Sequence, residues 1–106
     1  MPKIQYNKLV RDKIPQIIEH TGKACNIEIL TTEQYVDKLN EKLLEEVMEY
    51  LESGAIEELA DISEVIITIL KHNNMCAGDL ENIRLEKLKN RGGFEKRVLL
   101  KEVIEE

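Results

Sequence analysis

The stretch VDKLNEKLLEEVMEYLESGAIEELADISEVIITIL, residues 36–70, decides the fold because it contains two helical patterns separated by one break. In the first pattern, apolar side chains recur every three or four positions and form one stripe: Val36, Leu39, Leu43, Val47 and Tyr50. Ser53-Gly54 interrupts this pattern, and a second, more apolar pattern follows. Two helices joined by so short a break are expected to fold back on each other as an antiparallel hairpin.

The flanking sequence predicts two further helices, which gives an all-α, four-helix bundle-like fold. Thr31-Thr32-Glu33-Gln34 resembles a capping box at the start of the hairpin. Asp12 and Asp79 are expected to cap the outer two helices, with Pro15 in the first turn of the earlier one. The expected helices cover residues 12–22, 31–52, 55–73 and 79–91, and residues 27–30 allow one short extended segment.

Size and charge indicate a single domain and disfavour several classes of partner. A chain of 106 residues with 42% hydrophobic content supports one modest core, so residues 1–106 are expected to form one domain. The formal net charge of −6 has the wrong sign for binding a nucleic acid polymer. No apolar run reaches the roughly 18–20 residues of a membrane span, and the first residues lack a secretory signal. We therefore expect a cytoplasmic protein that does not contact membranes.

The second helix of the hairpin carries two carboxylates in unusual positions. Its apolar side chains cover well over half of its circumference, so we expect it to be buried on more than one side and to form the main contact of a homo-oligomer. Glu58 projects between Val65 and Ile69, within the apolar arc, and Asp61 lies at the edge of that arc. An ionised carboxylate is costly there, and no basic residue lies one turn away on this helix. A cation from solution is the simplest partner.

The first helix of the hairpin offers a second pair of carboxylates, Glu46 and Glu49, along one border of its apolar stripe. Lys42 lies one turn before Glu46 and can form an ordinary ion pair with it, which is a purely structural explanation of that carboxylate. The other acidic residues of this helix fall on the opposite side and are expected to be solvated: Glu41, Glu45 and Glu52.

The hairpin is expected to bring the two acidic pairs together. The members of each pair are three residues apart, so they lie on one helix face at about 5–6 Å. Carboxylate oxygens select hard cations, and Mg²⁺ with a phosphate-bearing substrate is the usual outcome. The competing interpretation is a solvated acidic face, which is common in a chain with 34% charged residues. The apolar surroundings of Glu58 favour a metal site made of Glu46, Glu49, Glu58 and Asp61.

Basic residues cluster at the two ends of the chain and are candidates for phosphate contacts. Near the first helix they stand where free backbone N–H groups already favour an anion. Near the last helix, Arg84, Lys87 and Arg91 share one face, and two glycines follow. Surface charges that balance the acidic excess are the alternative explanation. The candidates for substrate binding are Lys8, Arg11, Lys13, Lys87 and Arg91.

Four segments together resemble the MazG-like all-α nucleoside triphosphate pyrophosphohydrolases, a superfamily that includes phosphoribosyl-ATP pyrophosphohydrolase. The segments are YNKLVRDKIP at 6–15, EVME at 46–49, ELAD at 58–61 and KLKNRGGF at 87–94. EVME and ELAD correspond to the ExxE and ExxD motifs of the superfamily. The resemblance implies a MazG-type fold, Mg²⁺ bound by the four acidic residues, and a homodimer or homotetramer. The connector between the two motifs is shorter than in typical MazG proteins, which puts the pocket size in doubt.

These observations lead to one functional hypothesis and two alternatives. The hypothesis is hydrolysis of a nucleotide between its α- and β-phosphates with release of pyrophosphate, of the house-cleaning type, assisted by Mg²⁺. No serine, cysteine or histidine is placed as a convincing nucleophile, which favours direct attack by water. The nearer alternative is phosphoribosyl-ATP hydrolysis in histidine biosynthesis. The more distant alternative is a non-catalytic helical module that binds nucleotide or protein.

Overall fold

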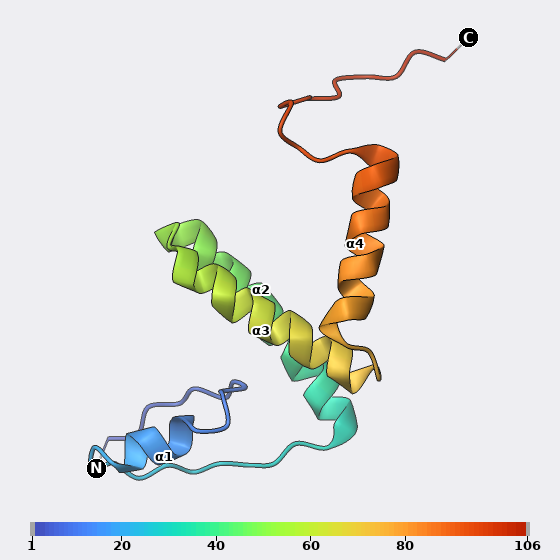
Figure 1. Ribbon diagram of the computed structural model, residues 1–106. Helices are drawn as coiled ribbons and strands as arrows, with labels where there is room; N and C mark the ends of the chain where they lie inside the picture. Colours follow the sequence, from blue (N-terminus) through green and yellow to red (C-terminus); the bar gives the residue numbers. More distant parts are fainter. Residues whose placement is uncertain (1, 106) are drawn as a thin grey trace.

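The computed structural model describes residues 2–105, and this part of the chain forms four helices and no strand (Figure 1). The helices are α1 (Ile14–Glu19), α2 (Thr32–Ser53), α3 (Ile56–His72) and α4 (Ala77–Arg91). The all-α class is therefore confirmed, while the extended segment allowed at residues 27–30 is not a strand. None of the described helices combines the length and apolar character needed to cross a bilayer.

The two central helices begin and end where the sequence predicts. Thr31 is the N-cap of α2: its hydroxyl accepts a hydrogen bond from the Gln34 N–H, and the Thr31 N–H donates to the Gln34 side chain. Gly54 ends this helix in the left-handed conformation, with φ of 66°. Ala55 and Asn73 flank α3, so the predicted capping box, break and third helix are all confirmed.

The predicted caps of the two outer helices are wrong. A turn closed by the Ile14 N–H and the Arg11 carbonyl precedes α1, so Lys13 and not Asp12 takes the N-cap position. Asp79 lies inside the first turn of α4, where its carboxylate accepts a hydrogen bond from the Cys76 N–H at 2.8 Å. A short acidic side chain can accept hydrogen bonds from free N–H groups either as the N-cap residue or from within the first turn. The sequence alone does not distinguish these two positions.

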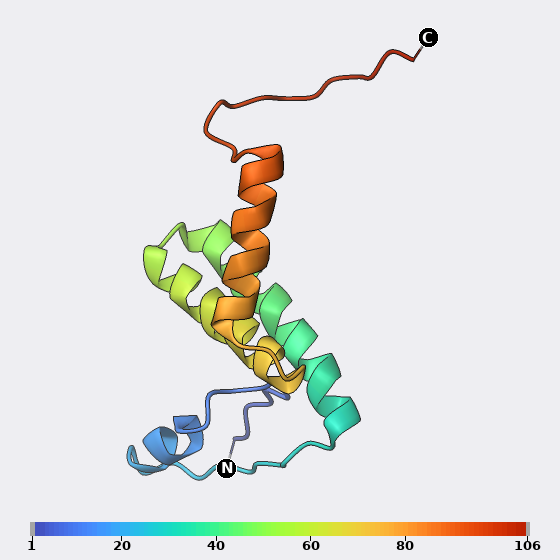
Figure 2. The same ribbon diagram turned by 45° about the vertical axis from the view of Figure 1, so that its right-hand side comes forward.

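The packed centre of the molecule is the antiparallel pair of α2 and α3, which run side by side in both views (Figures 1 and 2). Leu39 of α2 and Val65 of α3 are the buried hydrophobic residues in the described chain, and Glu46 is buried with them. In contrast, α3 is the only described helix that α4 contacts, and α4 projects away from the hairpin. One chain thus covers one face of the hairpin only.

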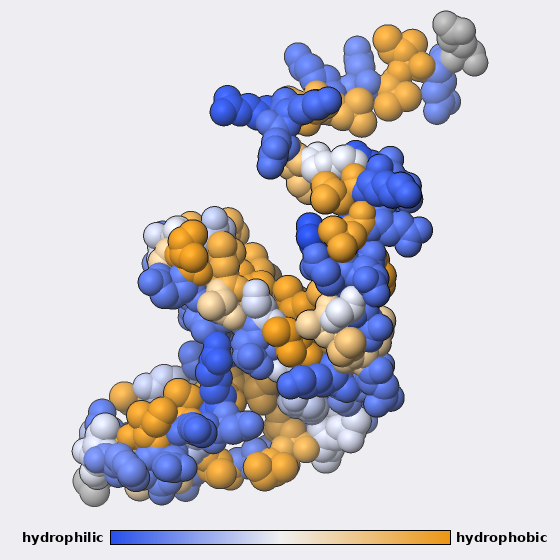
Figure 3. Space-filling model, in the orientation of Figure 1, coloured by the Kyte–Doolittle hydropathy of each residue, from blue (hydrophilic) through white to orange (hydrophobic). Residues whose placement is uncertain are grey.

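The molecule is extended for its length. Its radius of gyration is 19.0 Å, whereas a compact domain of this size has a radius of roughly 13 Å. The apolar arc of α3 is also only partly covered, since Ile56 is 73% exposed. The expected burial of α3 on more than one side is therefore not achieved within a single chain. Apolar side chains also lie uncovered along α4 and the C-terminal segment (Figure 3).

Candidate metal centre

Three of the four predicted metal ligands meet between α2 and α3. Glu46 comes from α2, and Glu58 and Asp61 come from one face of α3. One carboxylate oxygen from each lies within 4.8 Å of the other two. The antiparallel hairpin brings them together because Gly54 turns the chain tightly between the two helices. The three oxygens form a group that can hold a hard cation.

Glu46 is the most constrained member of this group. Glu46 is 6% exposed, and its Oε1 lies 3.2 Å from the ammonium nitrogen of Lys42. Its Oε2 is buried and has no hydrogen-bond partner in the described structure. Burial raises the pKa of Glu46, and the carboxyl of Glu49 raises it further, while Lys42 acts in the opposite direction. An unsatisfied buried carboxylate oxygen calls for an explanation, and a cation bound between Glu46 and the two other carboxylates would supply one.

Glu49, the fourth predicted ligand, is not one of the three converging residues. It is partly buried one turn after Glu46 and close enough to affect the pKa of that residue. Its role as a metal ligand stays a prediction.

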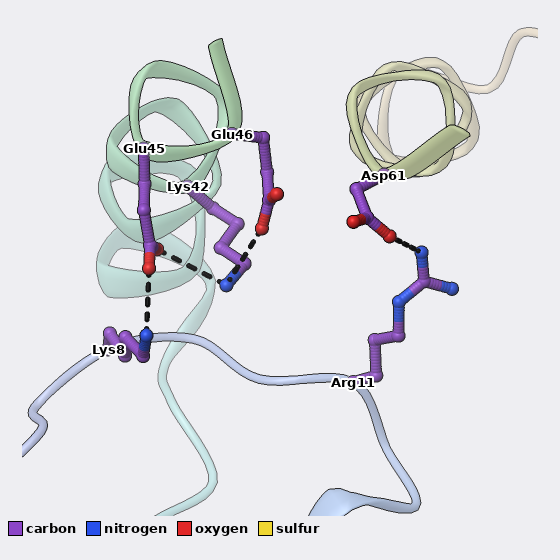
Figure 4. A network of polar contacts seen from close by, with 6 residues as sticks. All are labelled: Lys8, Arg11, Lys42, Glu45, Glu46 and Asp61. Atoms are coloured by element: carbon purple, nitrogen blue, oxygen red, sulfur yellow. Dashed lines mark hydrogen bonds and ion pairs between the residues drawn. The ribbon is translucent and has the colours of Figure 1, made fainter. Parts of the chain in front are cut away.

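The N-terminal segment crosses the hairpin and supplies two cations (Figure 4). Arg11 Nη2 lies 2.7 Å from Asp61 Oδ1, and Lys8 Nζ lies 2.8 Å from Glu45 Oε1. Lys42 stands between Glu45 and Glu46 and is 3.2 Å from each carboxylate. Asp61 therefore has a counterion within the chain, whereas Glu58 forms no ion pair among residues 2–105.

Glu45 is a site residue that sequence reasoning placed wrongly. It was expected to be solvated, but it is partly buried and accepts hydrogen bonds from Lys8 and Lys42. Burial acts to raise the pKa of Glu45, but the hydrogen bonds from the two lysines outweigh it and hold the pKa below its usual value. Helical periodicity describes one helix at a time, so it cannot show that residues 8–11 cover this side of α2.

A cavity of about 410 Å³ opens beside two of the three carboxylates, Glu46 and Asp61, whereas Glu58 is not part of its lining. This volume lies within the usual range for sites of small ligands. Its walls come from the N-terminal segment, α2 and α3, and they combine apolar side chains with charges of both signs. The polar lining residues include Arg11, Tyr35, Lys42, Glu46, Asp61 and Thr68. A ligand in this cavity would meet carboxylates and basic groups that are paired with each other, Asp61 with Arg11 and Glu46 with Lys42.

The five predicted basic residues are distributed over three places. Lys8 and Arg11 lie at the acidic cluster, and Lys13 is the N-cap residue of α1. Lys87 and Arg91 line a separate groove on α4, and α4 projects away from the hairpin (Figure 2). Within one chain, the structure therefore brings two of the five basic residues to the acidic cluster.

No protein-family model matches this chain, and no curated protein or solved structure matches it either. The functional assignment therefore depends on the chemistry of the site and on the sequence motifs.

Proposed function

We propose that the protein is a Mg²⁺-dependent nucleotide pyrophosphohydrolase with a MazG-like fold, and that Glu46, Glu58 and Asp61 hold the metal. Two observations on Glu46 support this most strongly: its buried Oε2 has no hydrogen-bond partner among the described residues, and one of its carboxylate oxygens lies within 4.8 Å of an oxygen of Glu58 and of Asp61. A buried carboxylate oxygen without a hydrogen-bond partner is costly, and a divalent cation bound there offsets that cost. Three carboxylate oxygens suit Mg²⁺ better than a softer metal.

The basic residues at the cluster have a role in substrate binding under this proposal. Arg11 is bound to Asp61 when no substrate is present, and its planar guanidinium is suited to bind a phosphate by two hydrogen bonds. Lys8 is held at the same edge by Glu45, and that hydrogen bond raises the pKa of Lys8. Lys8 therefore remains charged at neutral pH, and under this proposal both basic side chains orient the phosphate chain towards the carboxylates.

The reaction requires little covalent chemistry from the protein. Water attacks the α-phosphorus, the bond from this atom to the oxygen bridging to the β-phosphate breaks, and pyrophosphate leaves with the electron pair. When bound, Mg²⁺ offsets the negative charge of the phosphates. Positioning by the cavity walls and charge neutralisation by Arg11 and Lys8 supply the remaining catalysis.

A purely structural role for the carboxylates is the competing explanation, and the ion pairs of Lys42 and Arg11 favour it. Under that explanation Asp61 fastens Arg11 to the hairpin, and Glu46 is an ordinary partner of Lys42 within α2. It leaves Glu46 Oε2 and the ion-pair-free Glu58 unexplained.

Pyrophosphate release with and without Mg²⁺ tests the proposal, using a panel of nucleoside triphosphates and phosphoribosyl-ATP as substrates. We expect a nucleoside monophosphate and pyrophosphate from the triphosphates, and no reaction with excess chelator. Glu58→Gln should lower kcat/KM by about 100-fold or more, whereas the neighbouring, exposed Glu57→Gln should retain activity. Release of orthophosphate, or full activity of Glu58→Gln, would contradict the proposed site.

A further inference from the structure

Residues 7–12 cross the hairpin as a segment without helix or strand (Figure 4). Four of these residues form part of the wall of the cavity beside the carboxylates: Leu9, Val10, Arg11 and Asp12. The remaining walls come from α2 and α3, which pack against each other. A ligand that enters the cavity must therefore pass or move this segment.

Ion pairs fasten the segment to the hairpin. Arg11 Nη2 lies 2.7 Å from Asp61 Oδ1, and Lys8 Nζ lies 2.8 Å from Glu45 Oε1. The third polar contact described between this segment and the hairpin is one hydrogen bond from Lys38 to a main-chain carbonyl. The side chains of Arg11 and Asp61 are 56% and 39% exposed, and ion pairs this open to water are weak and screened by salt. A competing charge can therefore release the segment.

Arg11 occupies a carboxylate that the proposed metal site needs. Asp61 is one of the three residues whose carboxylate oxygens converge, and the Arg11 guanidinium is already bound to it. A divalent cation held by these oxygens would lie close to the guanidinium, and like charges repel each other more strongly at a protein surface than in bulk water. Arg11 and the cation therefore compete for Asp61.

The two basic residues at the carboxylates differ in what happens to them when a cation binds. Lys42 lies 3.2 Å from both Glu45 and Glu46, so it keeps Glu45 as a partner when Glu46 binds the cation. Arg11 has one ion-pair partner in the described part of the chain, and that partner is Asp61. Displacement of Arg11 therefore loosens the segment that carries it.

We infer that residues 7–12 form a strap over the cavity and that Arg11 is its latch, which a divalent cation releases from Asp61. The open strap admits a phosphate-bearing ligand, and the freed Arg11 then binds the phosphates. The nature of the cation and of the ligand rests on the proposed function. By linkage, the closed strap weakens binding of the cation by the same factor by which the cation favours opening.

The competition is tested by the affinity for Mg²⁺ in the absence of nucleotide, measured by titration calorimetry. Arg11→Met removes the competitor and should lower the Kd for Mg²⁺ about two- to fivefold, the factor that corresponds to one partly exposed ion pair. The matched control, Lys8→Met, removes the same charge and an ion pair of similar length, but its carboxylate, Glu45, is outside the converging group. Equal Kd values for the two variants, or weaker Mg²⁺ binding by Arg11→Met than by wild type, would overturn the latch.

Opening of the strap is tested by limited digestion with trypsin, with cleavage after Lys8 followed by mass spectrometry. Saturating Mg²⁺ should accelerate this cleavage in the wild type, while cleavage after Lys23, an exposed residue outside the strap, should not change. Asp61→Asn removes the partner of Arg11, so its cleavage after Lys8 should be fast with and without Mg²⁺. Equal cleavage of the wild type with and without Mg²⁺, or of the wild type and Asp61→Asn without metal, would overturn the strap.

These measurements separate failure of the strap from failure of the proposed function. A wild type that binds no Mg²⁺ would overturn both the metal site and the latch. If Mg²⁺ binds and the strap stays closed, the strap alone is overturned. If Mg²⁺ opens the strap and the protein releases no pyrophosphate, the proposed reaction fails and the strap is supported.

Discussion

Glu45 and Glu46 are neighbours on α2, yet their surroundings shift their pKa values in opposite directions. Hydrogen bonds from Lys8 and Lys42 outweigh the effect of burial on Glu45 and lower its pKa. For Glu46, burial dominates and raises the pKa. The carboxylate of Glu45 therefore stabilises the fold at neutral pH, whereas that of Glu46 is maintained at a cost to stability, as is common at functional sites.

The first prediction concerns Glu45→Gln. Because the folded state lowers the pKa of Glu45, its contribution to stability is present above the unfolded pKa and is lost as the pH falls through the folded pKa. The variant should unfold more easily at pH 7, by about 1 kcal/mol or less for a partly exposed ion pair. The difference from wild type should disappear in acid. Urea titrations of both proteins at several pH values, without metal, measure this.

The second prediction is the opposite behaviour of Glu46→Gln in the same titrations. A raised folded pKa means that the native state binds the proton more tightly, so stability falls as the pH rises through the interval between the unfolded and folded values. Removing the charge should therefore leave the metal-free protein at least as stable as wild type at pH 7. A loss of stability at pH 7 larger than that of Glu45→Gln would show that the Lys42 ion pair, and not burial, controls this residue.

At the scale of elements, the sequence predicts what is local and misses what comes from elsewhere in the chain. Thr31, the break at Gly54 and the ends of α3 follow from capping and periodicity alone, and the structure confirms them. The carboxylates of Glu46, Glu58 and Asp61 were also found in this way, because a tight hairpin constrains which faces meet. The ion pair of Arg11 with Asp61 joins residues 50 positions apart, and no helical pattern encodes it.

The third prediction tests the capping box that begins α2. Thr31→Ala removes the acceptor for the Gln34 N–H and should cost about 1 kcal/mol of stability. Thr32→Ala is the matched control, since Thr32 is exposed and is not the N-cap residue. Denaturation curves of the two variants should differ by most of that amount. Equal stability would mean that packing of α2 against α3, and not the cap, fixes where the helix begins.

At the scale of the whole molecule, the wide apolar arc of α3 led us to expect a homo-oligomer. In one chain, part of the apolar surface of α3 is uncovered. Two further apolar surfaces, which the sequence did not predict, are also exposed: one on α4 and the C-terminal segment, and one on α2. These surfaces are uncovered in one chain because α4 projects away from the hairpin (Figure 1). A bundle formed by one chain would have covered these side chains and given a smaller radius of gyration.

The fourth prediction follows from the isolation of α4 in a single chain. If a second copy stabilises this helix, its folding is linked to protein concentration by mass action. Hydrogen exchange of backbone amides in residues 77–91 should accelerate when the protein is diluted below its dimer dissociation constant, while exchange in the α2–α3 hairpin should change less. Exchange of α4 that does not depend on concentration would contradict a partner copy.

Binding of a divalent cation by Glu46, Glu58 and Asp61 is tested by the melting temperature of the protein with and without Mg²⁺. At about ten times its dissociation constant, Mg²⁺ should stabilise the wild type by roughly 1.4 kcal/mol, which raises the melting temperature of a domain of this size by roughly 5–10 °C. Glu58→Gln should melt no lower than wild type without metal and should lose most of that rise, whereas Glu57→Gln should keep it. A Glu58→Gln protein that melts lower without metal and still gains the full rise with Mg²⁺ would contradict the carboxylate site.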